Sequence, residues 1–340
     1  MLKRGLALTP VKFGISFTAT AFNQAGALIH VYRDGSIQLN HGGTEMGQGL
    51  YIKIAQIVAE EFKLPLDRVT ITATTTAKVP NTSATAASSG TDLNGMAAQA
   101  AARTIKGRLI AFAAEHWQTA AEDIEFLQPG RVRLGDREIA FTELVDAAYM
   151  GRVSLSSTGY YKTPKIHWDR ALGRGRPFYY YAYGAACSEV TVDILTGEYR
   201  VTRVDILHDA GASLNTAIDI GQIEGGFVQG MGWLTTEELC WDSQGRFTSH
   251  APSTYKIPAC GDRPAEFNVA IFDNTRNRED TIYGSKAVGE PPLMLAISVL
   301  HALSDAVASV AGHRICPRLD SPATPEHILM AIERLKAASP

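Results

Sequence analysis

The chain has 340 residues, of which 45% are hydrophobic and 20% are charged, so it can bury a large core and has an ordinary globular composition. Its 32 lysine and arginine residues nearly balance 35 acidic residues. This balance gives no long-range attraction to nucleic acid or to anionic membranes, and neither is an expected partner. No stretch predicts a signal peptide or a membrane span, so we expect a cytoplasmic protein.

The first half of the chain predicts two strands, a helix and a further strand. Residues 27–33 and 36–40 alternate around Asp34-Gly35, which is a strong β-hairpin signal. Apolar residues then recur at helical spacing over 50–62, and residues 69–73 are typical of a strand.

A similar order returns later, with strands expected at 190–195 and 199–207 and a glycine-rich helix that continues to residue 232. We therefore expect an α+β fold of two lobes of mixed β-sheet covered by helices and related by an internal repeat. The expected lobes are 1–165 and 166–340. The basic, glycine-rich stretch 170–177 is the expected linker.

Residues 41–49 place four glycines directly before the first helix. Free backbone amides and the helix dipole at this point would suit a phosphate or another anion. The loop has neither the P-loop nor the dinucleotide-binding pattern, so no nucleotide site is predicted. The alternative is that the glycines serve only a tight turn.

Two further stretches have unusual compositions. Residues 81–92 are almost all small and hydroxylated, which suits either a ligand or a capped polar loop. Residues 225–232 set Gln229 among four glycines in an expected helix, at a cost of roughly 1 kcal/mol for each interior glycine relative to alanine. Close helix packing, or the approach of Gln229 to a flat cofactor, would explain these glycines.

Glu290 is followed by two prolines that can begin a helix. It is therefore either a reactive carboxylate at the helix mouth or a simple charge on the helix dipole. The four cysteines lie far apart and have no C-x-x-C spacing, so we expect no iron–sulfur cluster or metal site formed by side chains of this chain.

Six motifs, taken in order, resemble the molybdenum-binding subunit of xanthine dehydrogenase, in the molybdenum hydroxylase family. They are Lys-Phe-Gly-Ile-Ser-Phe-Thr at 12–18, Asn-Gln-Ala-Gly-Ala-Leu-Ile at 23–29, Gly-Gly-Thr-Glu-Met-Gly-Gln-Gly at 42–49, Ala-Ala-Ser-Ser at 86–89, Pro-Ser-Thr-Tyr-Lys-Ile-Pro at 252–258 and Ser-Lys-Ala-Val-Gly-Glu-Pro-Pro at 285–292. The resemblance covers nearly the whole chain but reaches only the C-terminal half of that subunit.

The resemblance implies a molybdenum–molybdopterin cofactor shared with the other, N-terminal half of the subunit. It also implies that 2Fe-2S clusters, FAD and NAD belong to partner segments, and that the isolated chain is inactive. In the implied site, Phe17 and Thr18 contact the substrate. The implied cofactor-binding residues are Gln48, Ala86, Ala87, Ser88, Ser89 and Gln229.

The implied reaction is hydroxylation of hypoxanthine or xanthine with oxygen taken from water. Glu290 would be the general base that removes a proton from a metal-bound hydroxide, while a hydride passes to a sulfido ligand. One alternative is an aldehyde oxidase or another azaheterocycle hydroxylase of the same family. Another is a non-catalytic scaffold, which the presence of Gln48, Gln229 and Glu290 argues against.

Overall fold

The predicted hairpin is formed by strands β2 (Gln24–Val31) and β3 (Ile37–His41), which pair antiparallel. In the computed structural model, which describes residues 1–79, 81–273 and 276–338, the Asp34 carboxylate accepts hydrogen bonds from the amide and hydroxyl of Ser36 within the turn. Leu39 is fully buried, as are other apolar positions of the alternating pattern. Alternation along the strands therefore decides which face of the hairpin meets the core.

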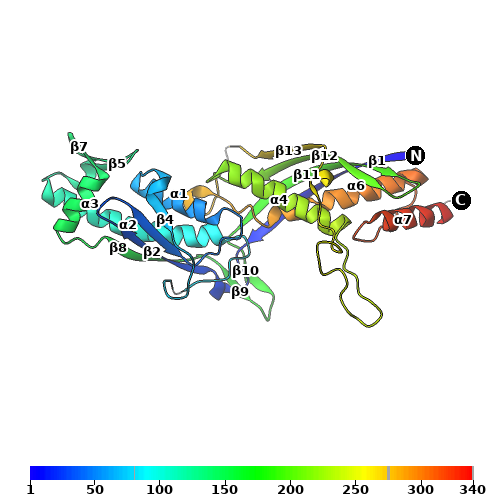
Figure 1. Ribbon diagram of the computed structural model, residues 1–340, viewed down its shortest axis with the longest axis horizontal. Coiled ribbons are helices and arrows are strands. Elements are labelled where there is room, and N and C mark those ends of the chain that lie inside the picture. The colour runs from blue at the N-terminus through cyan, green and yellow to red at the C-terminus, as the bar shows by residue number, and fades with distance from the viewer. Residues whose placement is uncertain (80, 274–275, 339–340) are drawn as a thin grey trace. The chain divides into compact units, whose positions relative to one another are not determined.

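The hairpin forms the centre of a four-stranded sheet with the order β4-β3-β2-β8, and helices α1 and α2 pack against it (Figure 1). A small three-stranded sheet, β5-β6-β7, and helix α3 complete this part of the chain. The bounds are α1 (Leu50–Phe62), β4 (Val69–Ile71), α2 (Gly90–His116), β5 (Ile124–Leu127), β6 (Arg131–Leu134), β7 (Arg137–Ala140), α3 (Phe141–Met150) and β8 (Ser156–Lys162).

A second four-stranded sheet has the order β1-β11-β12-β13, and its core contains residues of α4, α6 and α7 (Figure 1). Helix α7 begins at a proline, with the Thr324 hydroxyl accepting a hydrogen bond from the amide of His327. The bounds are β1 (Leu2–Ile15), β11 (Tyr180–Asp193), β12 (Tyr199–Asp209), α4 (Thr216–Thr235), β13 (Glu266–Ile271), α5 (Pro291–Leu295), α6 (Ile297–Ala308) and α7 (Pro325–Ala338).

The two sheets repeat one connectivity. In each, an antiparallel hairpin (β2-β3 or β11-β12) is followed by a crossover helix (α1 or α4) and by a strand parallel to the second hairpin strand (β4 or β13). A loop and a helix then follow, α2 in one case and α5 with α6 in the other. The predicted α+β fold with an internal repeat is confirmed.

The chain divides into two units that we call lobes. The first lobe consists of Gly14–Tyr180 and Asn277–Ser285, and the second of Met1–Phe13, Tyr181–Arg276 and Lys286–Pro340. The expected division at residue 165 differs from these lobes, because strand β1 begins in the second lobe and a short segment after β13 returns to the first. Residues 170–177 are not a linker either, since they run through the antiparallel ribbon of β9 (His167–Asp169) and β10 (Arg174–Arg176) within the first lobe.

The stretch Pro291–Ala311 is long and apolar enough to cross a membrane by length and composition alone, and 50% of its most apolar window is buried. Several of its side chains, including Val299, Leu303 and Val307, lie in the hydrophobic core of the second lobe. The burial of these side chains in the core explains why the stretch Pro291–Ala311 is apolar.

Candidate functional site

In the first lobe, the predicted site residues lie in loops at one edge of the main sheet. Ala27 of β2 pairs with His41 at the end of β3, so β3 ends near the point where β2 begins. Because β4 runs parallel to β3, β4 ends at the same edge of the sheet. The loops before β2, after β3 and after β4 therefore share this edge. They carry Phe17, Thr18, Gln48, Ala86, Ala87, Ser88 and Ser89.

Hydrogen bonds join these loops directly. The amide of Thr44 donates to Oγ1 of Thr85 at 2.9 Å. The hydroxyl of Ser83 donates to the carbonyl of Gln24, at the beginning of β2, at 3.1 Å. The glycine loop and the small-residue loop thus come together although about forty positions separate them in sequence.

Three backbone amides around the start of helix α1 donate hydrogen bonds to the carboxylate of Glu45. Its oxygens accept hydrogen bonds from the amides of Gly47 at 2.8 Å, Gly49 at 3.1 Å and Tyr51 at 2.9 Å. Burial acts to raise the pKa of Glu45, but the backbone hydrogen bonds outweigh burial and the pKa is lowered. The Glu45 carboxylate therefore binds three of the amides at which an external anion was expected.

Gln48 closes the same loop with its half-buried carboxamide. Its Nε2 donates to the carbonyl of Thr44 at 2.9 Å, and its Oε1 accepts from the amide of Met46 at 2.5 Å. A carboxamide carries two N–H groups, so one donor remains available after the bond to Thr44. The loop thus fixes the direction of Gln48 while leaving it able to bind a ligand.

The Ala-Ala-Ser-Ser loop has an uncommon backbone. Ala87 and Ser88 both have φ of 54°, in the left-handed region that costs a non-glycine residue roughly 1 kcal/mol. The loop ends at Ser89, whose hydroxyl donates to the carbonyl of Ala86 at 3.3 Å just before helix α2 begins. Two successive non-glycine residues in the left-handed region add backbone strain, which indicates that the conformation of this loop has a function.

Phe17 and Thr18 precede β2. The buried side chain of Asn23 accepts a hydrogen bond from the amide of Phe17 and donates one to its carbonyl, both at 2.8 Å. The Phe17 ring packs edge-on against Phe22 with the ring centroids 5.7 Å apart, and Thr18 is exposed. Asn23 therefore fixes the backbone of the segment that the resemblance assigns to the substrate.

In the second lobe, Gln229 and Glu290 are carried by segments in direct contact. A Cβ atom on Gly226 would lie 3.2 Å from Cβ of Pro292, and one on Gly230 would lie 2.3 Å from the carbonyl oxygen of Leu293. The absence of side chains at these two glycines lets α4 pack closely against the start of α5, which confirms close packing as one reason for the glycines. Gln229 and Glu290 are both exposed at this junction.

Two buried polar pairs near the predicted residues were missed by sequence reasoning. Lys286, within the Ser-Lys-Ala-Val-Gly-Glu motif, forms an ion pair with Asp209 at 2.6 Å. In the first lobe, the hydroxyl of Tyr180 donates to the carboxylate of Asp92 at 2.6 Å, and burial raises the pKa of Asp92 to about 7. The partners are 77 and 88 positions apart, so no local pattern could have paired them.

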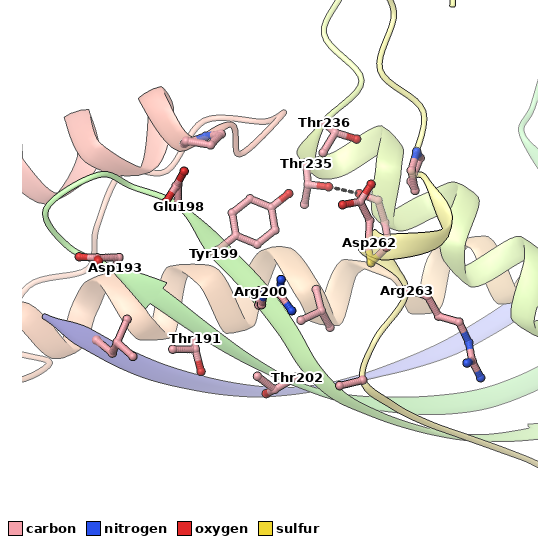
Figure 2. Close-up of a pocket in the computed structure, with 17 residues that line it drawn as sticks. Thr191, Asp193, Glu198, Tyr199, Arg200, Thr202, Thr235, Thr236, Asp262 and Arg263 are labelled. Carbon is pink, nitrogen blue, oxygen red and sulfur yellow. Dashed lines mark hydrogen bonds between the residues drawn. The ribbon is translucent and has the colours of Figure 1, made fainter.

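The second lobe also contains an open cavity of about 770 Å³ (Figure 2). Tyr199 points its hydroxyl towards Thr235 at one wall, and Arg200 and Arg263 are exposed lining residues. Tyr199 begins β12, whereas the ion pair to Lys286 lies at the end of that strand, roughly 33 Å away at the usual rise per residue. None of the predicted site residues lines this cavity.

The described residues contain no group of three or more His, Cys, Asp or Glu side chains that could hold a metal ion. Residues 1–264 match the family described as the molybdopterin cofactor-binding domain. The match covers most of the chain, and the chain belongs to this family.

Among curated proteins, the chain is 49% identical over 332 residues to the xanthine dehydrogenase/oxidase of Felis catus, and this region covers 96% of the chain but 23% of that protein. It is 45% identical over 332 residues to aldehyde oxidase 2 of Macaca fascicularis, with 97% and 23% coverage respectively. The chain therefore spans about a quarter of the length of these relatives.

The fold is also that of solved molybdenum enzymes. The crystal structure of a Cu,Mo CO dehydrogenase superposes on 99% of the chain with a TM-score of 0.83 and 23% sequence identity, and the match covers 42% of the corresponding chain in that structure. At this identity the likeness establishes the fold, and it agrees with the predicted molybdenum cofactor-binding type.

Proposed function

We propose that the chain forms part of the molybdopterin site of a molybdenum hydroxylase of the xanthine dehydrogenase type, which adds oxygen from water to hypoxanthine and xanthine. The observation that carries this proposal is the 49% identity to a xanthine dehydrogenase/oxidase over 96% of the chain. The proposed place of this reaction is purine metabolism.

The residues of the chain fit a molybdopterin by the chemistry of their donors. Gln48 and Gln229 offer carboxamides, and Ser88 and Ser89 lie in a loop of small side chains that permits close approach of a ligand. The proposed set that holds the cofactor is Gln48, Ala86, Ala87, Ser88, Ser89 and Gln229. Because the Glu45 carboxylate accepts hydrogen bonds from the amides of Gly47, Gly49 and Tyr51, these three amides are not available to an anionic group of the cofactor.

When bound, the cofactor supplies the two-electron redox chemistry. Glu290 acts as the general base: its exposed carboxylate at the start of α5 accepts a proton as the substrate is hydroxylated. Phe17 and Thr18 contact the substrate. The remaining contacts to cofactor and purine come from a further half of the molybdenum subunit, and iron–sulfur and flavin segments carry the electrons to NAD.

The test is Glu290→Gln in the assembled enzyme, because this change keeps the size of the side chain and removes the base. The rate of molybdenum reduction by xanthine should fall by about 10²- to 10⁴-fold, while molybdenum content is retained. Glu326→Gln is the control, since Glu326 is an acidic residue in the first turn of α7, whereas Glu290 directly precedes the first residue of α5. If xanthine reduced molybdenum at the parent rate in Glu290→Gln, Glu290 would be only a charge at a helix terminus, and the proposed mechanism would be refuted.

A second candidate is an aldehyde oxidase, which the 45% identity to a macaque aldehyde oxidase supports. Steady-state kcat/KM values of the assembled enzyme for xanthine, hypoxanthine, an aromatic aldehyde and an N-heterocycle distinguish the two. If the enzyme is a xanthine dehydrogenase, the purines should have the highest kcat/KM. A higher kcat/KM for the aldehyde would favour the aldehyde oxidase instead.

A further inference from the structure

The turn formed by residues 286–292, which we call the Glu290 turn, is fixed at its beginning by Lys286. The ammonium of Lys286 contacts the Asp209 carboxylate at 2.6 Å, and its backbone amide donates to the carbonyl of Ala210 at 2.8 Å. Both charged side chains are largely buried, with 10% and 16% of their surface exposed. The turn therefore begins at a defined place beside the end of β12.

The pair has further partners that hold it in one arrangement. Asp209 also accepts a hydrogen bond from the amide of Gly211 at 2.9 Å. The ammonium of Lys286 lies 5.2 Å from the centre of the Tyr183 ring. A buried ion pair gains little net stability because both charges lose water, but its directional contacts select one geometry.

The end of the Glu290 turn is held by packing. Pro291 and Pro292 are buried, and the lack of a side chain at Gly226 leaves space for Pro292 against helix α4. Within the turn, Val288 is also buried, whereas Gly289 and Glu290 are exposed. An exposed carboxylate thus lies between two anchors, one ionic and one apolar.

We propose that Lys286 and Asp209 are positioning residues for Glu290: the buried pair orders the turn and sets where the carboxylate of Glu290 lies. This inference rests on the proposed function of Glu290. A base must be held in reach of the proton it accepts, and a displacement of about 1 Å can cost on the order of 100-fold in rate. Lys286 supports the site through the backbone of the turn and takes no part in the proton transfer.

The first test measures order without reference to activity. Amide hydrogen exchange in the full chain should become at least about tenfold faster over residues 287–293 in Lys286→Met, which keeps the aliphatic stem and removes the charge. Lys336→Met is the control, because Lys336 pairs at 2.8 Å with Glu333 on an exposed face of α7. Unchanged protection of the turn in Lys286→Met would overturn the proposal.

Asp209→Asn keeps the volume of the side chain and serves as the second variant, so the comparison stands if Lys286→Met unfolds. It should loosen the same residues, and Lys286→Arg, which keeps the charge, should restore protection relative to Lys286→Met. Loss of protection across the whole second lobe in Asp209→Asn, with no excess over 287–293, would make the pair a general stability element and overturn the positioning role.

The second test uses the assembled enzyme. Lys286→Met should lower kcat for xanthine by about 10- to 100-fold with little change in KM, and Lys286→Arg should recover part of the loss. A looser turn with an unchanged kcat would refute the positioning role while the proposed function stands. Full activity of Glu290→Gln would refute the proposed role of Glu290 as general base, whatever the exchange data show.

Discussion

Gly230 packs so closely on Leu293 that a Cβ added to the glycine would lie 2.3 Å from the carbonyl oxygen of Leu293. This contact between α4 and α5 places Gln229 beside the segment that carries Glu290. The same helix contains Gly225, where a Cβ would meet no atom within 4 Å. The two glycines form a matched pair for an experiment.

Gly225→Ala should stabilise the chain by about 0.5 to 1 kcal/mol, because alanine restricts the unfolded chain and favours the helix. Gly230→Ala should destabilise it by about 1 to 3 kcal/mol, because backbone must move to admit the new carbon. Urea unfolding of both variants measures the difference. Equal effects of the two changes would mean that α4 and α5 do not pack as closely as described.

Glu45→Gln should loosen the glycine loop at neutral pH, because the carboxylate that accepts three backbone hydrogen bonds is replaced by a weaker acceptor. The expected loss is about 1 to 2 kcal/mol. The pKa of Glu45 is lowered in the folded chain, so its contribution is present above the unfolded pKa near 4.5 and is lost as the pH falls through the lower folded pKa. Exchange rates of the Gly47, Gly49 and Tyr51 amides test this directly, and slow exchange retained in the variant would contradict it.

Asp92→Asn should stabilise the chain at pH 8 more than at pH 5. Burial raises the pKa of Asp92 to about 7, so the folded chain holds this proton more tightly than the unfolded chain. The stabilising contribution of the protonated group is complete below the unfolded pKa near 3.8 and is lost as the pH rises through about 7. The expected gain at pH 8 is about 1 to 3 kcal/mol, measured as the difference in melting temperature across this pH range. A gain independent of pH would show that Asp92 is not protonated on folding.

Ala87→Gly should raise the free energy of unfolding by about 0.5 to 1 kcal/mol, since glycine adopts the left-handed backbone of Ala87 without strain. The control is Ala98→Gly, because Ala98 is buried within α2 and should lose at least about 1 kcal/mol. A loss of stability in Ala87→Gly would mean that the loop does not store strain at this position.

The glycine loop shows how far local sequence could predict the site. The composition of residues 41–49 correctly placed a sharply turning loop before a helix, because positive φ angles such as those of Gly47 and Gly49 are a local property. The hydrogen-bond partners of the backbone amides in this loop could not be predicted from local sequence. Whether they face a ligand or the Glu45 carboxylate depends on how the loop folds back on itself.

We could predict the strand and helix pattern, the internal repeat and the motifs of molybdopterin-binding domains from the amino-acid sequence alone, because periodicity and motif order are local along the chain. We could not predict in this way that β1 begins in the second lobe, that Lys286 pairs with Asp209 or that Tyr180 pairs with Asp92. Such contacts join positions that are far apart in the chain and form only when strands assemble into sheets and helices pack on them. No pattern of neighbouring residues encodes which distant side chain will lie opposite.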